Sequence, residues 1–314
     1  MDAIYIILIV VASLAVLFFV ACFICFRMAF YSSKKDKIID EMPPGEIYEP
    51  YYEQMRAWNK EAEGYNTEEV SITSYDGLTL RGSYTEHLKG APVEIMFHGY
   101  RGNSKRDLCG GLQRCKELKR NVLAVNHRAH ANSDGSVITF GVKERYDVKA
   151  WAEYAYKRFG KEVPLIITGI SMGASTVLMA SSLLLPETVV GVVADCGFSS
   201  AKDIIKQVIK EMHLPPSVCY PFVKLGAIIY GGFNPEETSA EEEVKKSKLP
   251  ILLIHGDKDE RVPCEMSEKI KKACSSKCEL VIFEGAGHGT SLLVDKDKYI
   301  KSVQDFEKNY KIVV

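Results

Sequence analysis

The sequence lacks any excess of positive charge, since 40 basic residues stand against 41 acidic ones in 314 residues. Nucleic-acid-binding domains carry a clustered basic surface and recognisable motifs, and neither is visible here. We therefore expect no nucleic-acid partner. Internal repeats and low-complexity tracts are also missing, which excludes a solenoid or a disordered array.

Paired cysteine spacing is missing as well. The nine cysteines are an odd number without the regular spacing of a secreted disulfide scaffold, so reduced thiols in a cytoplasmic domain are expected. Cys274 and Cys278 have no second Cys/His pair nearby, and His127 and His130 have no third ligand. Because a structural zinc ion needs four such ligands, we predict no metal site.

What the sequence does have is an uncharged N-terminal run, Ala3–Phe26, of 24 residues. As a helix it would span about 36 Å, enough to cross a bilayer. Its bulky end favours a retained transmembrane anchor at residues 3–27, and a cleaved signal peptide is the alternative. Arg27, Lys34, Lys35 and Lys37 follow the run, so the positive-inside rule places the rest of the chain on the cytoplasmic side.

A charged segment at residues 28–66 reads as a juxtamembrane linker with a helix near 51–63 that packs on the domain through Trp58. From residue 67 to 314 strand patterns alternate with helix patterns, which predicts one domain with a mostly parallel sheet covered on both faces. The expected strands are 69–74, 78–84, 93–97, 122–126, 164–169, 189–194, 251–255 and 280–283. The expected helices include 108–120, 141–159 and 174–185. Residues 198–248 exceed one crossover helix and predict a small helical cap, the alternative being ordinary connecting helices.

The chemistry of the chain centres on Ser171, which lies in the sequence Gly-Ile-Ser-Met-Gly at 169–173. An apolar run precedes it and a helix pattern follows, which is the strand–turn–helix context of a nucleophile elbow. Gly169 and Gly173 carry no Cβ, so strand and helix can approach closely around the serine. The helix that begins there points N–H groups at a reacting carbonyl.

A serine hydroxyl needs a base, and the base needs an acid to hold its tautomer. His288 follows the last predicted strand within a glycine-rich loop that can reach the serine. Asp257 and Asp259 both follow the strand at 251–255. Their position is favoured over Asp195 at the end of the preceding strand, but spacing alone does not choose between the two.

An oxyanion hole needs two backbone N–H groups. We expect them from Met172, directly after the serine, and from Tyr100 in the loop after the strand at 93–97. The Tyr100 ring is also a candidate to line the acyl pocket.

From about Val70 onward the chain resembles the α/β-hydrolase family, and more narrowly its serine-aminopeptidase-like and esterase-like members with an N-terminal membrane anchor. The resemblance is carried by His-Gly-Tyr-Arg-Gly-Asn at 98–103, the loop 126–135, the segment 139–147, the serine motif, His-Gly-Asp-Lys-Asp-Glu-Arg-Val-Pro at 255–263 and Gly-His-Gly at 287–289. It implies an α/β-hydrolase fold and puts the catalytic acid at Asp259. The loop departs from the family pattern at Asn126, Ala129 and Ala131. The resemblance implies acyl transfer to water without a cofactor.

The first hypothesis is a membrane-anchored serine hydrolase that cleaves an ester-like bond, carboxylester or thioester, in a small acyl substrate through Ser171, His288 and Asp259. A peptidase acting on short peptides is the alternative that the same resemblance allows. A non-catalytic protein that kept the fold is a third hypothesis, which the complete set of triad residues disfavours.

Overall fold

An eight-stranded sheet forms the centre of the protein, whose computed structural model describes residues 3–33 and 42–312. The strands lie in the order β1-β2-β4-β3-β5-β6-β7-β8. Pairing is parallel from β4 to β8, and the hairpin of β1 and β2 adds an antiparallel edge. The strands are β1 Thr67–Thr73, β2 Thr79–Thr85, β3 Val93–Phe97, β4 Asn121–Val125, β5 Leu165–Ile170, β6 Val189–Asp195, β7 Ile251–Gly256 and β8 Cys278–Phe283.

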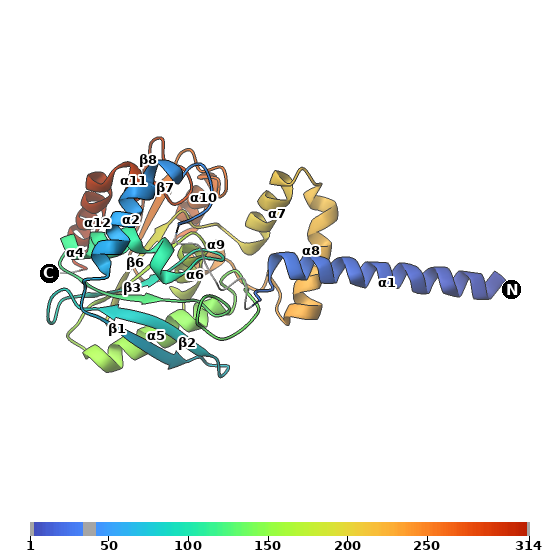
Figure 1. Ribbon diagram of the computed structural model, residues 1–314, viewed down its shortest axis with the longest axis horizontal. Helices are drawn as coiled ribbons and strands as arrows, with labels where there is room; N and C mark the ends of the chain where they lie inside the picture. Colours follow the sequence, from blue (N-terminus) through green and yellow to red (C-terminus); the bar gives the residue numbers. More distant parts are fainter. Residues whose placement is uncertain (1–2, 34–41, 313–314) are drawn as a thin grey trace.

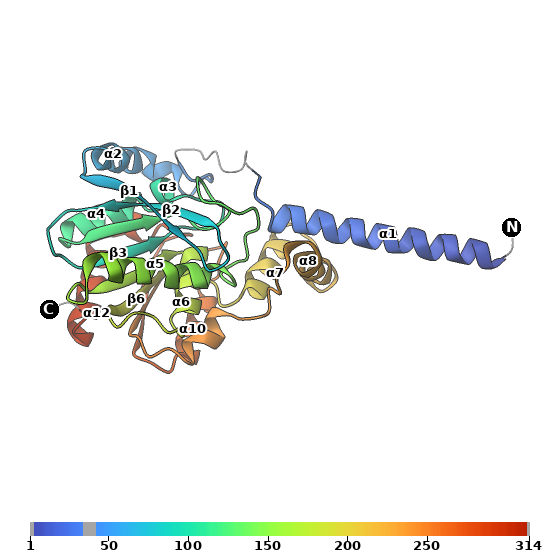
Figure 2. The same cartoon turned by 90° about the horizontal axis from the view of Figure 1, so that it is seen from below.

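Helices cover both faces of this sheet (Figures 1 and 2). Strand side chains alternate between two cores: one packs against α5, α6, α9 and α10, and the other against α4, α11 and α12. The helices are α1 Ala3–Ala29, α2 Tyr52–Ala62, α3 Ser104–Asp107, α4 Cys109–Glu117, α5 Glu144–Phe159, α6 Met172–Ala180, α7 Ala201–Glu211, α8 Pro216–Gly231, α9 Ala240–Val244, α10 Glu265–Ala273, α11 Ser291–Val294 and α12 Lys296–Tyr310, with a 3₁₀ turn at Glu49–Tyr51. The predicted α/β-hydrolase fold with a mostly parallel sheet is confirmed.

The first helix, α1, projects from the domain and ends beside α7 and α8 (Figure 1). Among the described residues it is the one helix long and apolar enough to cross a membrane. Its last part is not free, because Cys22 and Phe26 are buried against the domain and Phe30 follows them into the core. The positive-inside argument used Lys34, Lys35 and Lys37, which lie outside the described residues, as do residues 313–314 of the predicted domain.

Two predicted helix boundaries were wrong. The helix expected at 174–185 is α6, which already begins at Met172 and ends at Ala180. The Ser181 hydroxyl bonds back to the Leu178 carbonyl at 2.7 Å, and a serine that bonds locally in this way competes with further helix. The helix expected at 108–120 is α4, which runs from Cys109 to Glu117. A separate short helix that was not predicted, α3, precedes it, and the Asn103 side chain caps α3 by accepting from Arg106 N–H at 2.7 Å.

Candidate active site

Ser171 stands on the sharp turn between β5 and α6. Its φ of +55° is in the left-handed region, a costly backbone conformation that persists only where the surroundings impose it. The glycines on either side permit the turn. A Cβ on Gly173 would lie 2.7 Å from the His98 carbonyl oxygen, and one on Gly169 would lie 2.5 Å from the Ala174 nitrogen. Both distances are too short for any side chain, so the sequence motif follows from steric necessity.

His288 reaches the serine from the loop after β8. Its Nε2 lies 2.9 Å from Ser171 Oγ, and its Nδ1 lies 2.7 Å from Asp259 Oδ2. The three side chains come from the ends of β5, β7 and β8, and the parallel sheet brings those ends to one edge. The described structure therefore brings together the three residues that the sequence predicted.

The two aspartates of the loop after β7 have different partners. Asp259 is buried and accepts from the N–H groups of Arg261 and Val262 at 3.0 and 2.8 Å. Burial alone would raise the pKa of Asp259, but the hydrogen bonds from His255 and His288 lower it to about 2. Asp257 instead accepts from Gly285 N–H at 2.7 Å. Of the two, Asp259 is the ionised carboxylate beside His288.

The loop after β3 lies directly against the serine. A Cβ on Gly99 would be 3.5 Å from Ser171 Cβ, so the backbone of residues 99–100 passes the reacting oxygen. The Asp107 carboxylate holds this loop by accepting from Gly99 N–H at 3.1 Å. On the other side the Tyr100 hydroxyl donates to the carbonyl of Ala29, the last residue of α1, at 2.8 Å. Tyr100 and Met172, which the sequence predicts as the oxyanion donors, lie on the two chain segments next to Ser171.

Four further histidines near the sheet top make hydrogen bonds within the protein. His98 Nε2 accepts from His127 N–H at 3.1 Å, and His130 Nε2 accepts from Arg101 N–H at 3.0 Å. Burial lowers the pKa of His127 to about 3 and that of His98 well below its usual value. His255 Nε2 lies 2.7 Å from the Val262 carbonyl and 3.3 Å from Asp259 Oδ2, so it packs behind the acid.

Three residues near the site carried no signal in the sequence. The Tyr48 hydroxyl donates to the His288 carbonyl at 2.8 Å although the residues are 240 positions apart. On α7, Gln207 donates to the Glu260 carbonyl at 3.2 Å, and Glu211 pairs with Arg261 at 2.8 Å. The predicted cap region therefore borders the loop that carries the acid.

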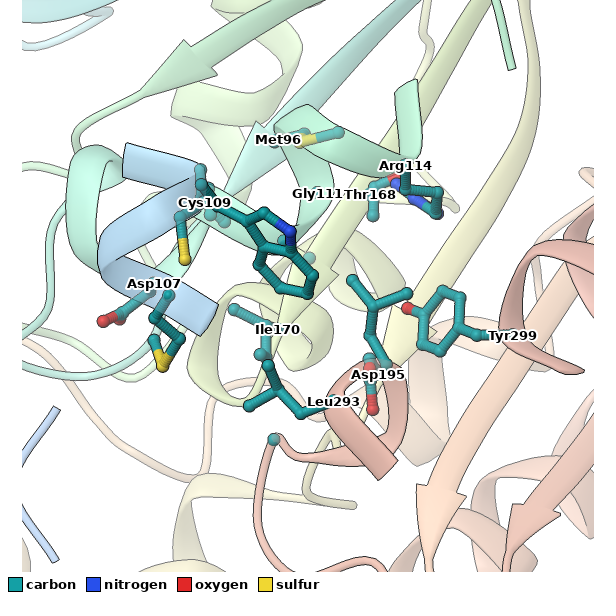
Figure 3. A pocket seen from close by; sticks show the side chains of 17 residues that line it. Met96, Asp107, Cys109, Gly111, Arg114, Thr168, Ile170, Asp195, Leu293 and Tyr299 are labelled. Carbon is teal, nitrogen blue, oxygen red and sulfur yellow. The ribbon is translucent and has the colours of Figure 1, made fainter. Parts of the chain in front are cut away.

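A cavity of about 80 Å³ lies between the end of β5 and the helices α2 and α4. Ile170 and Gly289, the neighbours of Ser171 and His288, line it together with Trp58 of α2. Figure 3 shows Asp195 and Tyr299 on one wall and Cys109 and Asp107 across from them. Burial raises the pKa of Asp195 to about 6, and its Oδ1 has no partner among the described residues. The volume suits a few water molecules.

Among the described residues, one group of side chains has the spacing of a metal site, namely Cys196, Asp259 and His288. Two of its members, His288 and Asp259, bond to each other, and burial raises the pKa of the Cys196 thiol well above its usual value.

The sheet order, the serine turn and the Ser-His-Asp geometry define the class, an α/β-hydrolase. Residues 138–311 match the prolyl oligopeptidase family, more than half of the chain, and the protein belongs to that family. It is accordingly a serine hydrolase, esterase-like or peptidase-like, as the sequence predicted.

The chain is also similar to individual proteins. The chain is 25% identical to the uncharacterised protein YqkD of Bacillus subtilis, over 76% of this chain and 78% of the relative. It is 26% identical to the protein bem46 of Schizosaccharomyces pombe, over 76% of each. An esterase structure from Pyrococcus furiosus aligns with a TM-score of 0.64 at 22% identity, covering 80% of this chain and 95% of the esterase. An acylaminoacyl peptidase from Pyrococcus horikoshii aligns with a TM-score of 0.58 at 19% identity, covering 80% of this chain and 42% of the peptidase. Structural likenesses at this identity show the fold.

Proposed function

We propose that the protein hydrolyses an ester-like bond, carboxylester or thioester, in a small acyl substrate, with Ser171 as nucleophile, His288 as base and Asp259 as the orienting acid. The observation that carries the proposal is the unbroken line of hydrogen bonds from Ser171 Oγ through the imidazole to the Asp259 carboxylate, at 2.9 and 2.7 Å. Both lengths lie within the range that proton transfer and tautomer selection require.

The reaction begins when His288 Nε2 takes the proton of Ser171 as Oγ attacks the acyl carbon. Asp259 accepts from Nδ1–H, which leaves Nε2 free to act as the base and stabilises the imidazolium that forms. His288 then gives the proton to the leaving group as the tetrahedral intermediate collapses to an acyl-enzyme. Water, deprotonated by the same nitrogen, attacks the acyl-enzyme, and the second collapse restores the serine hydroxyl.

The negative oxygen of each tetrahedral intermediate is assigned to the N–H groups of Met172 and Tyr100. Met172 opens α6, whose N-terminal end carries a partial positive charge. The Gly99–Tyr100 backbone lies beside the serine and is held there by Asp107 and by the end of α1. A preorganised donor of this kind is worth about 3–4 kcal/mol to the transition state.

A peptidase acting on short peptides is the second candidate, and membership of the prolyl oligopeptidase family favours it. An amide has a poorer leaving group than an ester, so peptide cleavage depends more strongly on protonation by His288. A peptidase would turn over aminoacyl amides as well as esters, whereas an esterase would turn over esters or thioesters alone.

We also propose that α1 anchors the enzyme in a membrane with the catalytic domain on the cytoplasmic side. The support is the apolar length of α1 and the basic residues Arg27, Lys34, Lys35 and Lys37 after it. The proposed division is a membrane span at 3–27, a juxtamembrane segment at 28–66 and a hydrolase domain at 67–314 with its cap at about 198–248.

The test is a substrate panel of short p-nitrophenyl esters, acyl thioesters and aminoacyl amides, with Ser171→Ala as control. We expect hydrolysis of at least one ester or thioester, covalent labelling by a fluorophosphonate, and loss of both in Ser171→Ala. The neighbouring Ser175 hydroxyl bonds to the Phe198 carbonyl at 2.9 Å, so Ser175→Ala is the matched variant that keeps labelling. Labelling that persists in Ser171→Ala would contradict the proposal, and turnover of the amides would assign the peptidase reaction.

A further inference from the structure

The helix α8 crosses the last third of α1 instead of packing on the sheet. Figure 1 shows α8 running across α1, and in Figure 2 α8 is seen nearly end-on while α1 still lies in the plane of the picture. The two helices therefore run in different directions and cross. If α1 passes through a bilayer, α8 lies across that span and along the membrane surface.

The crossing is tight. A Cβ on Gly226 would lie 3.2 Å from the Phe26 nitrogen and 3.3 Å from the Cys22 carbonyl carbon. Aromatic contacts flank it, with Phe222 5.5 Å from Phe18 between ring centroids. Tyr230 adds a hydrogen bond from its hydroxyl to the Phe19 carbonyl at 3.1 Å. The depth of α8 along α1 is thus fixed near Cys22.

The crossing point at Cys22 coincides with the boundary of the bilayer's hydrocarbon core. α1 has 27 residues, about 40 Å of helix, against a hydrocarbon core of about 30 Å. The surplus of about 10 Å corresponds to about seven residues, which is the distance from Ala29 back to the crossing at Cys22. With α1 spanning from its N-terminal end, α8 lies at the boundary between acyl chains and headgroups.

Several large apolar side chains of the cap remain partly exposed. Six large apolar side chains of the α7–α8 turn and of α8 are between 37% and 58% exposed, namely Met212, Leu214, Val218, Ile228, Ile229 and Tyr230. We call these six residues the cap surface. The one charged residue within α8, Lys224, is paired with Glu236 at 2.7 Å. Exposed apolar patches of this kind on a soluble protein mark an interaction site.

We propose that the cap surface inserts into the interfacial layer of the lipid bilayer that α1 spans, so that α1 and α8 together form the membrane-bound part of the enzyme. The partner is the boundary of acyl chains and headgroups, and the inference rests on the anchoring role proposed for α1. The proposal is supported by the position of the cap surface, which adjoins α1, the helix proposed to lie in the bilayer. Interfacial helices bury their apolar face about 5–10 Å into this layer.

The same arrangement brings the active site close to the membrane surface. Ala29, seven residues beyond the crossing, accepts the hydrogen bond from Tyr100 in the proposed oxyanion loop. The rings of Phe30 and Phe140 pack together with their centroids 5.7 Å apart, and the rings of Phe140 and Tyr100 with their centroids 5.0 Å apart. An acyl ester that resides in the bilayer would then meet the site without leaving the interface.

The test is quenching of introduced tryptophans by lipids brominated on their acyl chains, using the full chain in vesicles. Val218→Trp and Ile229→Trp report on the cap surface, and Val10→Trp on α1. Leu184→Trp is the matched control. Leu184 is 86% exposed and lies in the connection between α6 and β6. This connection is at the opposite end of the strands from Ser171. Emission of Trp58 and Trp151 is subtracted using the unsubstituted protein, and thermal unfolding confirms that each variant folds.

We expect brominated chains to lower the emission at positions 218 and 229 at least about twofold relative to position 184, as for a side chain at the acyl boundary. Quenching at position 10 without quenching at 218 and 229 overturns this inference and leaves the anchor intact. No quenching at position 10 overturns the anchor as well. Blue-shifted, unquenched emission at 229 together with cross-linked dimers would assign the cap surface to a second copy of the chain, which also overturns the proposal.

Discussion

At the residue scale, the site depends on one carboxylate shared by two imidazoles. Asp259 faces His288 at 2.7 Å and His255 at 3.3 Å, and backbone N–H groups occupy its other oxygen. Both oxygens of the carboxylate therefore accept hydrogen bonds, Oδ1 from the backbone and Oδ2 from His288. Such a group stays ionised and fixed, which is what the base needs from its acid.

Asp259→Asn is therefore expected to lower kcat by about 10³–10⁴-fold, because an amide in place of the carboxylate stabilises the wrong histidine tautomer. Asp257→Asn provides the matched control. That residue sits in the same loop and, within the described part of the chain, accepts from Gly285 N–H and not from His288. The kcat of Asp257→Asn should therefore change by less than about tenfold. The measurement is steady-state hydrolysis of a short ester. Equal losses in the two variants would remove Asp259 from the assigned role.

Tyr48 positions the histidine loop from outside the hydrolase domain. Its hydroxyl donates to the His288 carbonyl, and a single neutral hydrogen bond contributes about 0.5–1.5 kcal/mol. Tyr48→Phe should then lower kcat/KM up to about tenfold through misplacement of the imidazole. Tyr52→Phe breaks an equivalent 2.8 Å bond to the Pro43 carbonyl and should leave ester turnover unchanged. If Tyr52→Phe lowered kcat/KM equally, both losses would reflect reduced stability of the protein and not the position of His288.

At the scale of elements, the strands were predictable because each has a strong local pattern. All five residues of β3 and of β4 are buried. Apart from Glu94 and Asn121 they are apolar, as is typical of central parallel strands. The hairpin followed from Asp76-Gly77, where Gly77 adopts φ +87°. Serine, histidine and the pair of aspartates followed from chain order, and the family resemblance selected Asp259.

Contacts between distant elements could not be predicted in this way. Nothing near Tyr48 in the chain indicates that it bonds to His288, since that contact exists only after the juxtamembrane segment folds over the domain. The crossing of α1 and α8 likewise depends on Gly226 meeting the backbone of Cys22. Periodicity within one helix does not show which other helix it will meet.

Gly226→Ala tests that crossing. In an isolated helix the change would stabilise by about 1 kcal/mol. Here the new methyl group meets the Cys22 backbone, which cannot rotate away, and overpacking of this kind costs about 1–3 kcal/mol. We expect a net loss, seen as a lower thermal unfolding midpoint in vesicles. Gly64→Ala is the control. Its new Cβ would lie 3.4 Å from the nearest atom, the Glu61 carbonyl oxygen, so the unfolding midpoint should stay the same or rise. A higher midpoint for Gly226→Ala would mean that α1 and α8 separate without cost.

At the scale of the whole molecule, protonation of buried histidines affects both the stability of the fold and the loop beside the active site. The loop that carries Tyr100 rests on neutral histidines: His98 donates from Nδ1 to the Gly99 carbonyl and accepts through Nε2, and His130 uses its two nitrogens in the same way. A protonated ring has no acceptor. Acid must therefore weaken the fold at the loop that holds the proposed oxyanion donor of Tyr100.

The sign of this effect follows from the two states of His127. Its pKa is about 3 in the folded protein because burial disfavours the charge, and about 6.5 when unfolded. Between these values the unfolded chain binds more protons, so the free energy of unfolding falls as pH falls from about 6.5 towards 3. For His127 alone the loss between pH 7 and pH 5 is about 2 kcal/mol.

The test compares variants, because other groups act in the opposite sense. Asp195, with its pKa raised to about 6, binds protons more readily when folded and stabilises the protein on acidification over part of the same range. His127→Gln keeps a donor for the His98 carbonyl, which His127 Nε2 reaches at 3.1 Å, but does not titrate. Urea unfolding at pH 7 and pH 5 should show the loss of stability reduced by about 2 kcal/mol in His127→Gln. Parallel stability curves for the two proteins would mean that His127 is not held neutral, and the acid sensitivity of the fold would then originate elsewhere.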